Sequence, residues 1–437
     1  MSDLVRQAVT ILFARGFIRI AQFVAFLLLA RFMTPAEFGW FGIVTTAMTL
    51  AAMLGSLGLR QSFTYEIGQK RMTPGEAVGT TLVLWPVLTL FSAAVIYLLY
   101  GDQIPGLSSL QTGGLIVLGV AATMFVMLIQ GVYLGRGDIN AFSFSETLPR
   151  IALMIFAAGL ALTASVTLFT ALWAHVGGFV LAVPVALWLA LRGAGKPLPR
   201  LDRLGGMLGY GLIFAFNLFV ITLCSRISMF VIENYWGAEA AGQFFAAVRV
   251  NEIFLQAATA LGMVLFSNAA RQEPGVSVLG RNARIACWIF WFFLALAILV
   301  AFAAPQLLTI ILGGNYAPAG TALQILAFGL APAAAGKVIY PTLAGQGKPF
   351  FGTPVIIFSL LINLGLAFAL VPTLGVHGGA WALVVGQYVL LAGYMVSCRR
   401  LENIPFRTFL VPRIYDLKQS VRIMRSKIPN VLRRTNN

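Results

Sequence analysis

Apolar stretches long enough to cross a lipid bilayer follow one another along almost the whole of this 437-residue chain. A bilayer core of about 30 Å needs roughly 20 mainly apolar residues in a helix, and the polar and Gly/Pro-rich breaks divide the chain into such stretches. The twelve predicted spans are 10–32, 38–59, 77–100, 112–134, 143–163, 168–191, 207–233, 240–267, 284–304, 319–342, 351–371 and 377–397. Because 59% of the residues are hydrophobic and only 10% are charged, no segment is left for a soluble domain. The sequence predicts an all-α integral membrane protein.

The first predicted span follows a short polar segment, 1–9, and contains Arg15 and Arg19. It is longer and more charged than the apolar region of a secretory signal peptide. We therefore expect it to be a retained first membrane helix.

Basic residues are concentrated in every second loop between the predicted spans. The loops expected in the cytoplasm contain Arg60, Lys70, Arg71, Arg136, Arg192, Lys196, Arg200, Arg203, Arg271, Arg281, Arg284 and Lys348. The alternate loops contain essentially none, and Arg31 is the nearest to an exception. Because cytoplasmic loops carry an excess of Lys and Arg, both termini are predicted to be cytoplasmic. The net charge of +16 therefore reflects membrane topology and does not indicate nucleic-acid binding.

The cytoplasmic tail, 398–437, is also basic and has two interpretations. Apolar residues recur in it at intervals of three and four, namely Ile414, Leu417, Val421, Met424 and Ile428. This spacing is typical of an amphipathic helix that lies on an anionic membrane surface. A solvated tail is the alternative, and the sequence leaves both open.

Cysteine and histidine side chains are few and scattered, at Cys224, Cys287, Cys398, His175 and His377. Neither a disulfide framework, a zinc site nor a Ser-His-Asp arrangement is predicted from them. The chain also contains no GxxxxGK[ST] phosphate loop, which argues against an ATP-driven pump. We expect a transporter, with no enzymatic activity and no cofactor.

An internal duplication relates the two halves of the chain. The turn FMTPAEFGWF at 32–41 matches YWGAEAAGQF at 235–244, with Gly and Phe aligned at an offset of 203. Two further matches follow in order, 57–59 with 261–263 and 135–137 with 345–347. An offset of six helices preserves orientation, so the halves are predicted to be parallel repeats around a central cavity, an arrangement suited to alternating access.

The predicted boundaries follow from this duplication. An N-lobe of six helices covers 10–191, a cytoplasmic linker covers 192–206, and a C-lobe of six helices covers 207–397. Pro332, within a segment of small residues at 329–336, is predicted to bend the tenth helix.

Several ionisable side chains are predicted inside the spans, where each charge costs about 2.5 to 3.5 kcal/mol at a helix centre. The basic ones are Arg15, Arg19, Arg150, Arg226, Arg249 and Lys337. Arg19 and Arg226 are the best placed, because each lies well inside the first helix of a lobe. Guanidinium groups bind phosphate oxygens bidentately and stay charged at physiological pH. These residues are therefore predicted to bind a pyrophosphate in a water-filled cavity, although Arg15 and Lys337 lie near helix ends, where long side chains also extend to the interface.

The acidic residues within the spans, Glu146 and Glu252, have two interpretations. Glu146 is four residues from Arg150, and Glu252 is three from Arg249, spacings that allow local ion pairs. Alternatively, Glu252 or Glu146 would bind a proton or a sodium ion and couple transport to a gradient. The sequence leaves both open.

Two stretches near the first predicted turn, LARFMTPAEFGWF at 29–41 and GSLGLR at 55–60, resemble the start of polysaccharide-biosynthesis proteins of the Wzx type. The segments PTLGVHGGAWA at 372–382 and LAGQGK at 343–348 are similar to a late helix entry and a cytoplasmic turn of the same family. These proteins are lipid-linked oligosaccharide flippases of the MOP (MATE-like) exporter superfamily. The resemblance extends from about residue 10 to residue 397.

The resemblance implies a flippase of the bacterial inner membrane. Its cargo would be an undecaprenyl-pyrophosphate-linked oligosaccharide, moved to the outer leaflet for export of a surface polysaccharide such as exopolysaccharide, capsule or O-antigen. It implies a basic central cavity, membrane lipids as surroundings, and a polysaccharide polymerase and export machinery as partners. We expect the protein to act as a monomer.

Three alternatives compete with this function. A MATE-like small-molecule efflux transporter would share the architecture but favour acidic cavity residues, and a lipid II flippase would differ only in the sugar carried. A membrane polysaccharide polymerase or ligase would need a substantial outer loop, whereas the longest one here, 305–318, has some 14 residues and no charges.

Overall fold

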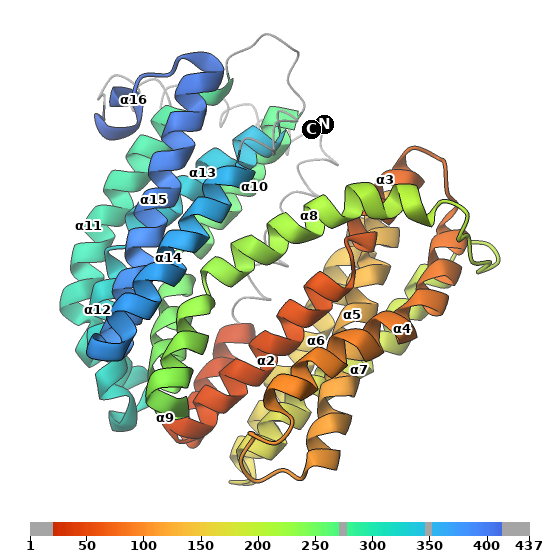
Figure 1. The fold of residues 1–437 in the computed structure, drawn as a ribbon, viewed down its shortest axis with the longest axis horizontal. Coiled ribbons are helices and arrows are strands. Elements are labelled where there is room, and N and C mark those ends of the chain that lie inside the picture. Colours follow the sequence, from red (N-terminus) through yellow and green to blue (C-terminus); the bar gives the residue numbers. More distant parts are fainter. Residues whose placement is uncertain (1–20, 271–277, 346–351, 413–437) are drawn as a thin grey trace, which may run out of the picture. The chain divides into compact units, whose positions relative to one another are not determined.

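The computed structural model describes residues 21–270, 278–345 and 352–412, and these residues are nearly all helical, with no strand among them. The first described helix is the short apolar segment Ala21–Phe32. The remaining helices (Figure 1) are α2 (Pro35–Gly55), α3 (Leu59–Gly68), α4 (Pro74–Tyr100), α5 (Ser109–Arg136), α6 (Ile139–Leu162), α7 (Leu168–Leu191), α8 (Leu204–Cys224), α9 (Ile227–Phe254), α10 (Gln256–Ala270), α11 (Val278–Leu312), η1 (Gly314–Tyr316), α12 (Ala317–Ala327), α13 (Leu330–Gly345), α14 (Thr353–Leu374), α15 (Val376–Glu402) and α16 (Arg407–Leu410).

Eight of these helices are long and apolar enough to cross a membrane, and two bent pairs raise that number to ten within the described residues. Predicted and observed spans agree for α2, α4, α5, α6, α7, α11, α14 and α15. Of the first predicted span, 10–32, only the part from residue 21 onward lies within the described residues. The predicted all-α membrane fold is confirmed.

The bent pairs correct the predicted seventh and tenth spans. Helices α8 and α9 meet at an angle of 47°, and α12 and α13 at 53°. The second bend lies before Pro332, between α12 and α13. Pro332 itself is in the first turn of α13, where its missing N–H costs no helical hydrogen bond. Within α9, Gly237 has φ 77° and ψ −179°, so the turn predicted between the seventh and eighth spans is confirmed there.

Local sequence explains where several helices begin. Thr34 and Glu37 form a capping box at the start of α2, and Thr73 and Glu76 form the same box at the start of α4. In each box the threonine hydroxyl accepts a hydrogen bond from the glutamate N–H, and the glutamate carboxylate accepts one from the threonine N–H. The proline that follows each threonine suits the first helical position.

The chain divides into two compact units, and each unit is made of three segments that are not consecutive in the sequence. Unit 1 comprises 1–249, 303–324 and 360–383, and unit 2 comprises 250–302, 325–359 and 384–437. The lobe boundaries inferred from the sequence stay predictions. The predicted interfacial helix of the tail falls almost entirely at 413–437, outside the described residues.

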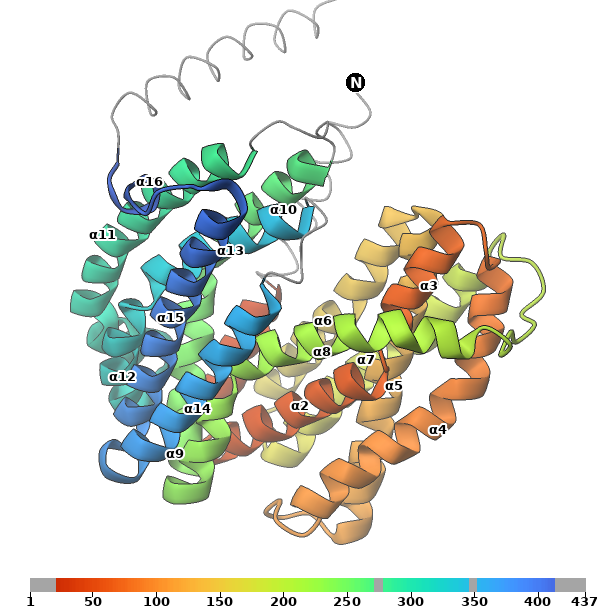
Figure 2. The same ribbon diagram turned by 45° about the horizontal axis from the view of Figure 1, so that its top comes forward.

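Unit 1 is organised around α5, which packs against α3, α4 and α7, while α6 packs against α7 (Figure 2). At the crossing of α3 and α5, a Cβ atom on Gly131 would overlap the carbonyl oxygen of Arg60. In unit 2, α10 packs against α13, and a Cβ atom on Gly262 of α10 would overlap the carbonyl oxygen of Lys337 on α13. The glycine belongs to the longer helix α5 in unit 1 and to α10 in unit 2.

Within unit 1, α2 and α9 cross at two glycines that the duplication pairs with one another. A Cβ atom on Gly39 would overlap the carbonyl oxygen of Ala238, and one on Gly242 would overlap that of Pro35. Pro35 and Ala238 are separated by the same 203 positions as Gly39 and Gly242. Reciprocal contacts of this kind are those expected across a two-fold axis, so the packing supports the duplication.

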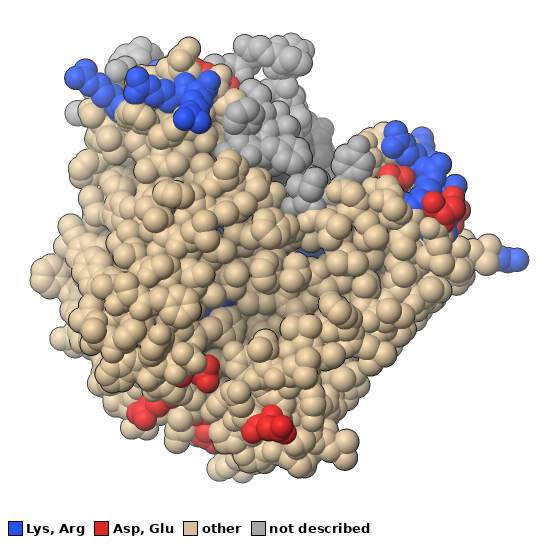
Figure 3. Space-filling view, viewed as in Figure 1, with Lys and Arg blue, Asp and Glu red and all other residues tan. Residues whose placement is uncertain are grey.

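Basic side chains of unit 1 gather around α3, the start of α4 and the segment 192–203 (Figure 3). Two acidic residues lie at the far ends of the same helices, because Asp102 follows the end of α4 and Glu37 is in the first turn of α2, whose other end leads to α3. This separation agrees with the orientation predicted from the loops.

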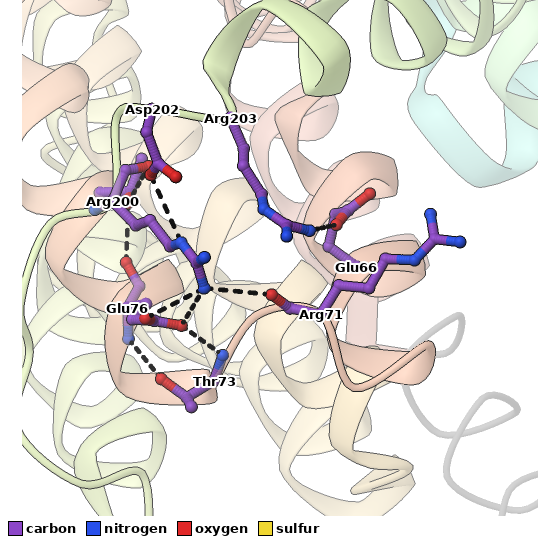
Figure 4. Close-up of polar contacts among 8 residues, drawn as sticks. Glu66, Arg71, Thr73, Glu76, Arg200, Asp202 and Arg203 are labelled. Carbon is purple, nitrogen blue, oxygen red and sulfur yellow. Dashed lines mark hydrogen bonds and ion pairs between the residues drawn. The ribbon is translucent and has the colours of Figure 1, made fainter.

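The segment 192–203 is held against α3 and α4 by several polar contacts (Figure 4). Arg200 pairs with Glu76 at 3.3 Å, and its backbone N–H donates to the hydroxyl of Thr80 at 2.9 Å. Arg203 pairs with Glu66 at 3.6 Å. Glycines at 75 and 79 allow the close approach, since a Cβ atom on either would press on the backbone of this segment. The predicted linker is thus held against α3 and α4 over residues 192–203, and we call this segment the strap.

Candidate functional site

Ionisable and amide side chains from five helices gather inside unit 1. We call them the arginine cluster, and they are Arg60 on α3, Gln130 on α5, Glu146 and Arg150 on α6, His175 on α7 and Arg249 on α9.

Arg60 enters the cluster because the chain turns between α2 and α3. Gly58 adopts φ 72°, a left-handed conformation that glycine takes without strain, and α3 begins directly after it. The Nη1 atom of Arg60 donates to Oε1 of Gln130 at 3.4 Å, whereas its buried Nε has no hydrogen-bond partner. Burial lowers the pKa of Arg60, and the negative charge of Glu146 partly offsets this. An arginine stays charged under such conditions.

Glu146 and Arg150 form the local ion pair that the sequence allowed. The Nη2 atom of Arg150 lies 3.7 Å from Oε1 of Glu146, and about a quarter of each side chain is exposed. Arg150 also donates to the backbone carbonyl of Glu146. The charge of Glu146 also acts on Arg60.

His175 belongs to the cluster and also contacts two aromatic side chains. Its ring centre lies 6.0 Å from that of Phe41 and 5.3 Å from that of Phe179. Arg150 and Arg249 are close enough for their charges to act on the ring. The guanidinium carbon of Arg249 lies 4.8 Å from the centre of the Phe245 ring, a cation–π contact. Two cations therefore flank a histidine that the sequence had treated as isolated.

The other predicted site residues lie elsewhere. Arg15 and Arg19 fall outside the described residues. Arg226 lies in unit 1 at the bend between α8 and α9, and its side chain is partly exposed. Glu252 and Lys337 belong to unit 2, on α9 and α13, and are also partly exposed. The pairing of Arg249 with Glu252 stays a prediction.

Sequence reasoning missed three members of the cluster. Arg60 follows the last residue of a predicted span and was assigned to a loop, while Gln130 carries no charge and His175 has no neighbouring ligand in sequence. A signal for Arg60 was Gly58, two positions before it, which allows the chain to turn between α2 and α3. Only the crossing of α3 with α5 brings Arg60 and Gln130 together.

The chemistry of the cluster suits a negatively charged group. It contains three guanidinium groups and one carboxylate, and guanidinium groups bind phosphate or carboxylate oxygens through paired N–H bonds. Electrostatic attraction is strengthened where water is scarce. No group of three His, Cys, Asp or Glu side chains suited to a metal ion occurs among the described residues.

A family model described as polysaccharide biosynthesis protein matches residues 4–266, more than half of the chain. The chain belongs to this family. Its eight to ten membrane-spanning helices among the described residues make this chain a multi-pass membrane protein.

Two solved structures have the same fold. The lipid II flippase MurJ in an inward closed conformation is 14% identical, with a TM-score of 0.71 over 92% of this chain and 89% of that one. An inward-facing multidrug resistance MATE family transporter of the MOP superfamily is 17% identical, with a TM-score of 0.66 over 88% of this chain and 95% of that one. At these identities the likeness concerns the fold.

One curated protein is related over a short range. The uncharacterized membrane protein MJ1068 of Methanocaldococcus jannaschii is 30% identical over 95 residues, which make up 22% of this chain and 19% of that protein.

Proposed function

We propose that this protein is a flippase that moves an undecaprenyl-pyrophosphate-linked oligosaccharide across the bacterial inner membrane by alternating access, for export of a surface polysaccharide. The single observation that carries the proposal is the arginine cluster, which brings the guanidinium groups of Arg60, Arg150 and Arg249 together from three helices. A diphosphate is the part of such a cargo that needs cations inside a membrane protein. Membership of the polysaccharide biosynthesis family supports the same cargo class.

The driving force need not come from a nucleotide. An anionic headgroup that moves outward gains about 2.3 kcal/mol per elementary charge for each 100 mV of an inside-negative potential. We further propose Glu252 or Glu146 as the residue that takes a coupling proton or sodium ion.

The cargo class also sets the proposed partners. A polysaccharide polymerase and export machinery would receive the oligosaccharide on the outer side, and the protein would act as a monomer surrounded by lipids. Arg15, Arg19, Arg226 and Lys337 would contact the diphosphate at other stages of its passage.

Two other functions fit the fold. The likeness to MurJ favours a lipid II flippase as the second candidate, since the same headgroup chemistry would suit the arginine cluster. A small-molecule efflux transporter shares the fold with the MATE protein, but an arginine-rich interior would repel the cationic drugs that such transporters are expected to carry.

Complementation of a bacterial strain without its exopolysaccharide flippase tests the proposal. At matched membrane levels, wild type should restore polysaccharide, and Arg150→Ala, Arg249→Ala, Arg19→Ala and Arg226→Ala should each reduce it by about tenfold or more. Arg31→Ala is the matched control, because Arg31 is exposed near the end of the helix Ala21–Phe32 and does not belong to the cluster.

Each other outcome has a distinct meaning. Restoration by all the variants would discard these arginines as binding residues. Failure of the wild type, with gain of drug resistance in the same cells, would replace the flippase with the efflux function. Restoration of growth in cells depleted of their lipid II flippase would select the second candidate.

A further inference from the structure

The bend between α8 and α9 has a local cause in the backbone. At the bend, Ser225 N–H donates to Thr222 O at 3.2 Å and Arg226 N–H donates to Leu223 O at 2.9 Å. Each of these bonds joins residues three positions apart, whereas an α-helical bond joins residues four positions apart. The backbone is therefore wound more tightly between α8 and α9, and the two helices meet at an angle of 47°. Arg226, a proposed diphosphate-binding residue, lies at the bend itself.

A buried asparagine from another helix bonds to both sides of this bend. Asn363 of α14 has 1% of its side chain exposed. Its Nδ2 donates to the carbonyl oxygen of Cys224, the last residue of α8, at 2.7 Å. Its Oδ1 accepts from the hydroxyl of Ser228, in the first turn of α9, at 3.1 Å. Because a carbonyl oxygen only accepts, the contact with Cys224 fixes which way the amide faces.

Both hydrogen bonds of Asn363 are formed by buried residues. Ser228 has 1% of its side chain exposed and Cys224 has 8%, so water cannot easily replace either bond. A buried amide that loses its partners is more costly than the bonds are favourable. In this bent geometry the amide nitrogen and the amide oxygen of Asn363 each have a hydrogen-bond partner, one on either side of the bend.

We propose that Asn363 is a positioning residue for Arg226. By bonding to Cys224 and Ser228, it fixes the backbone from which the Arg226 side chain leaves, and so fixes where the guanidinium meets the diphosphate. This inference rests on the proposed function, in which Arg226 binds that group. Residues that hold a binding group in place contribute to affinity without touching the ligand.

The test is a double-mutant cycle on the full-length protein in lipid nanodiscs, with inorganic pyrophosphate as the probe. Asn363→Leu keeps a similar volume and removes both bonds, and it should weaken pyrophosphate binding by about tenfold. In an Arg226→Ala background it should cause no further loss, because the residue that it positions is gone.

A second buried asparagine supplies the matched control. Asn282 of α11 is 1% exposed and donates to Thr342 at 2.9 Å, within unit 2. Its Oδ1 is buried without a hydrogen-bond partner, so Asn282→Leu removes a buried amide that makes one bond, and it should leave the dissociation constant for pyrophosphate unchanged. A general effect of removing a buried amide would instead weaken binding in both variants, and this would overturn the inference.

A milder variant covers the case in which Asn363→Leu fails to fold. Ser228→Ala removes only the bond to Oδ1, and it should weaken binding by about threefold with Arg226 present and not at all without it. Losses that add in the Arg226→Ala background would overturn the positioning role and leave the flippase proposal intact. A wild-type protein that neither binds pyrophosphate nor restores polysaccharide would overturn both.

Discussion

At the scale of single residues, one carboxylate balances several guanidinium groups in the arginine cluster. Glu146 lies 3.7 Å from Arg150, and its charge also acts on Arg60. In the proposed function, an incoming diphosphate competes with Glu146 for the charge of these guanidinium groups.

This competition gives a prediction with a definite sign. Glu146→Gln should tighten the binding of inorganic pyrophosphate, by about tenfold for one removed carboxylate, because the resident competitor is gone. The same variant should lower the melting temperature, since Arg60 and Arg150 lose their counter-charge. Both can be measured on purified protein by titration calorimetry and thermal unfolding. Glu239→Gln, at an exposed position near Gly237, should change neither quantity, and weaker binding by Glu146→Gln would contradict the competition.

At the scale of secondary-structure elements, α2 and α9 cross with their backbones in direct contact. Gly39 and Gly242 let α2 and α9 touch, and each glycine faces the backbone of the other helix. No side chain intervenes, so there is nothing flexible that could move aside to admit an extra methyl group.

The reciprocity of this crossing predicts similar effects for two substitutions far apart in sequence. Gly39→Ala and Gly242→Ala should each destabilise the protein by about 1 to 3 kcal/mol, because each added methyl group meets a carbonyl oxygen. Gly114→Ala is the control, since no atom lies within 4 Å of a Cβ placed there, and helix propensity should make it neutral or slightly stabilising. Thermal unfolding in detergent would measure all three, and a large effect at only one of the two crossing glycines would contradict the reciprocal contact.

The strap at 192–203 is the second element with a testable property. Arg200 is held by Glu76 and Thr80, whereas Arg192 is exposed. Trypsin should therefore cleave slowly after Arg200, and Glu76→Gln or Thr80→Val should speed that cleavage several-fold, a size typical of partly exposed polar contacts. Cleavage after Arg192 in the same sample is the internal control. Equal rates after Arg200 in the wild type and both variants would show that the strap is held by other contacts.

At the scale of the whole molecule, the separation of charge predicts how the chain sits in the membrane. Gln69 lies beside α3 at the basic end of unit 1, and Gln103 lies between α4 and α5 at the acidic end; both are exposed. In intact cells, a membrane-impermeant thiol reagent should label Gln103→Cys and leave Gln69→Cys unlabelled until the cells are opened. The native Cys224, Cys287 and Cys398 are buried and give little background. Reversed labelling would invert the predicted orientation.

The sequence by itself determined the features that depend on local composition. Runs of apolar residues located the membrane helices, basic loops predicted their orientation, and the spacing of Gly39 and Gly242 revealed the duplication. These properties are legible because a bilayer of fixed thickness and a polar boundary impose the same requirement on every span.

Only the tertiary structure decided which charges meet. Arg60, Glu146, His175 and Arg249 come from four different helices, and their meeting depends on how each helix is rotated and where it crosses its neighbours. The bend at Arg226 was likewise hidden, because it is held by Asn363 from a helix about 140 positions away in the sequence. Hydropathy is a property of each segment alone, whereas a binding site is a property of how the segments pack.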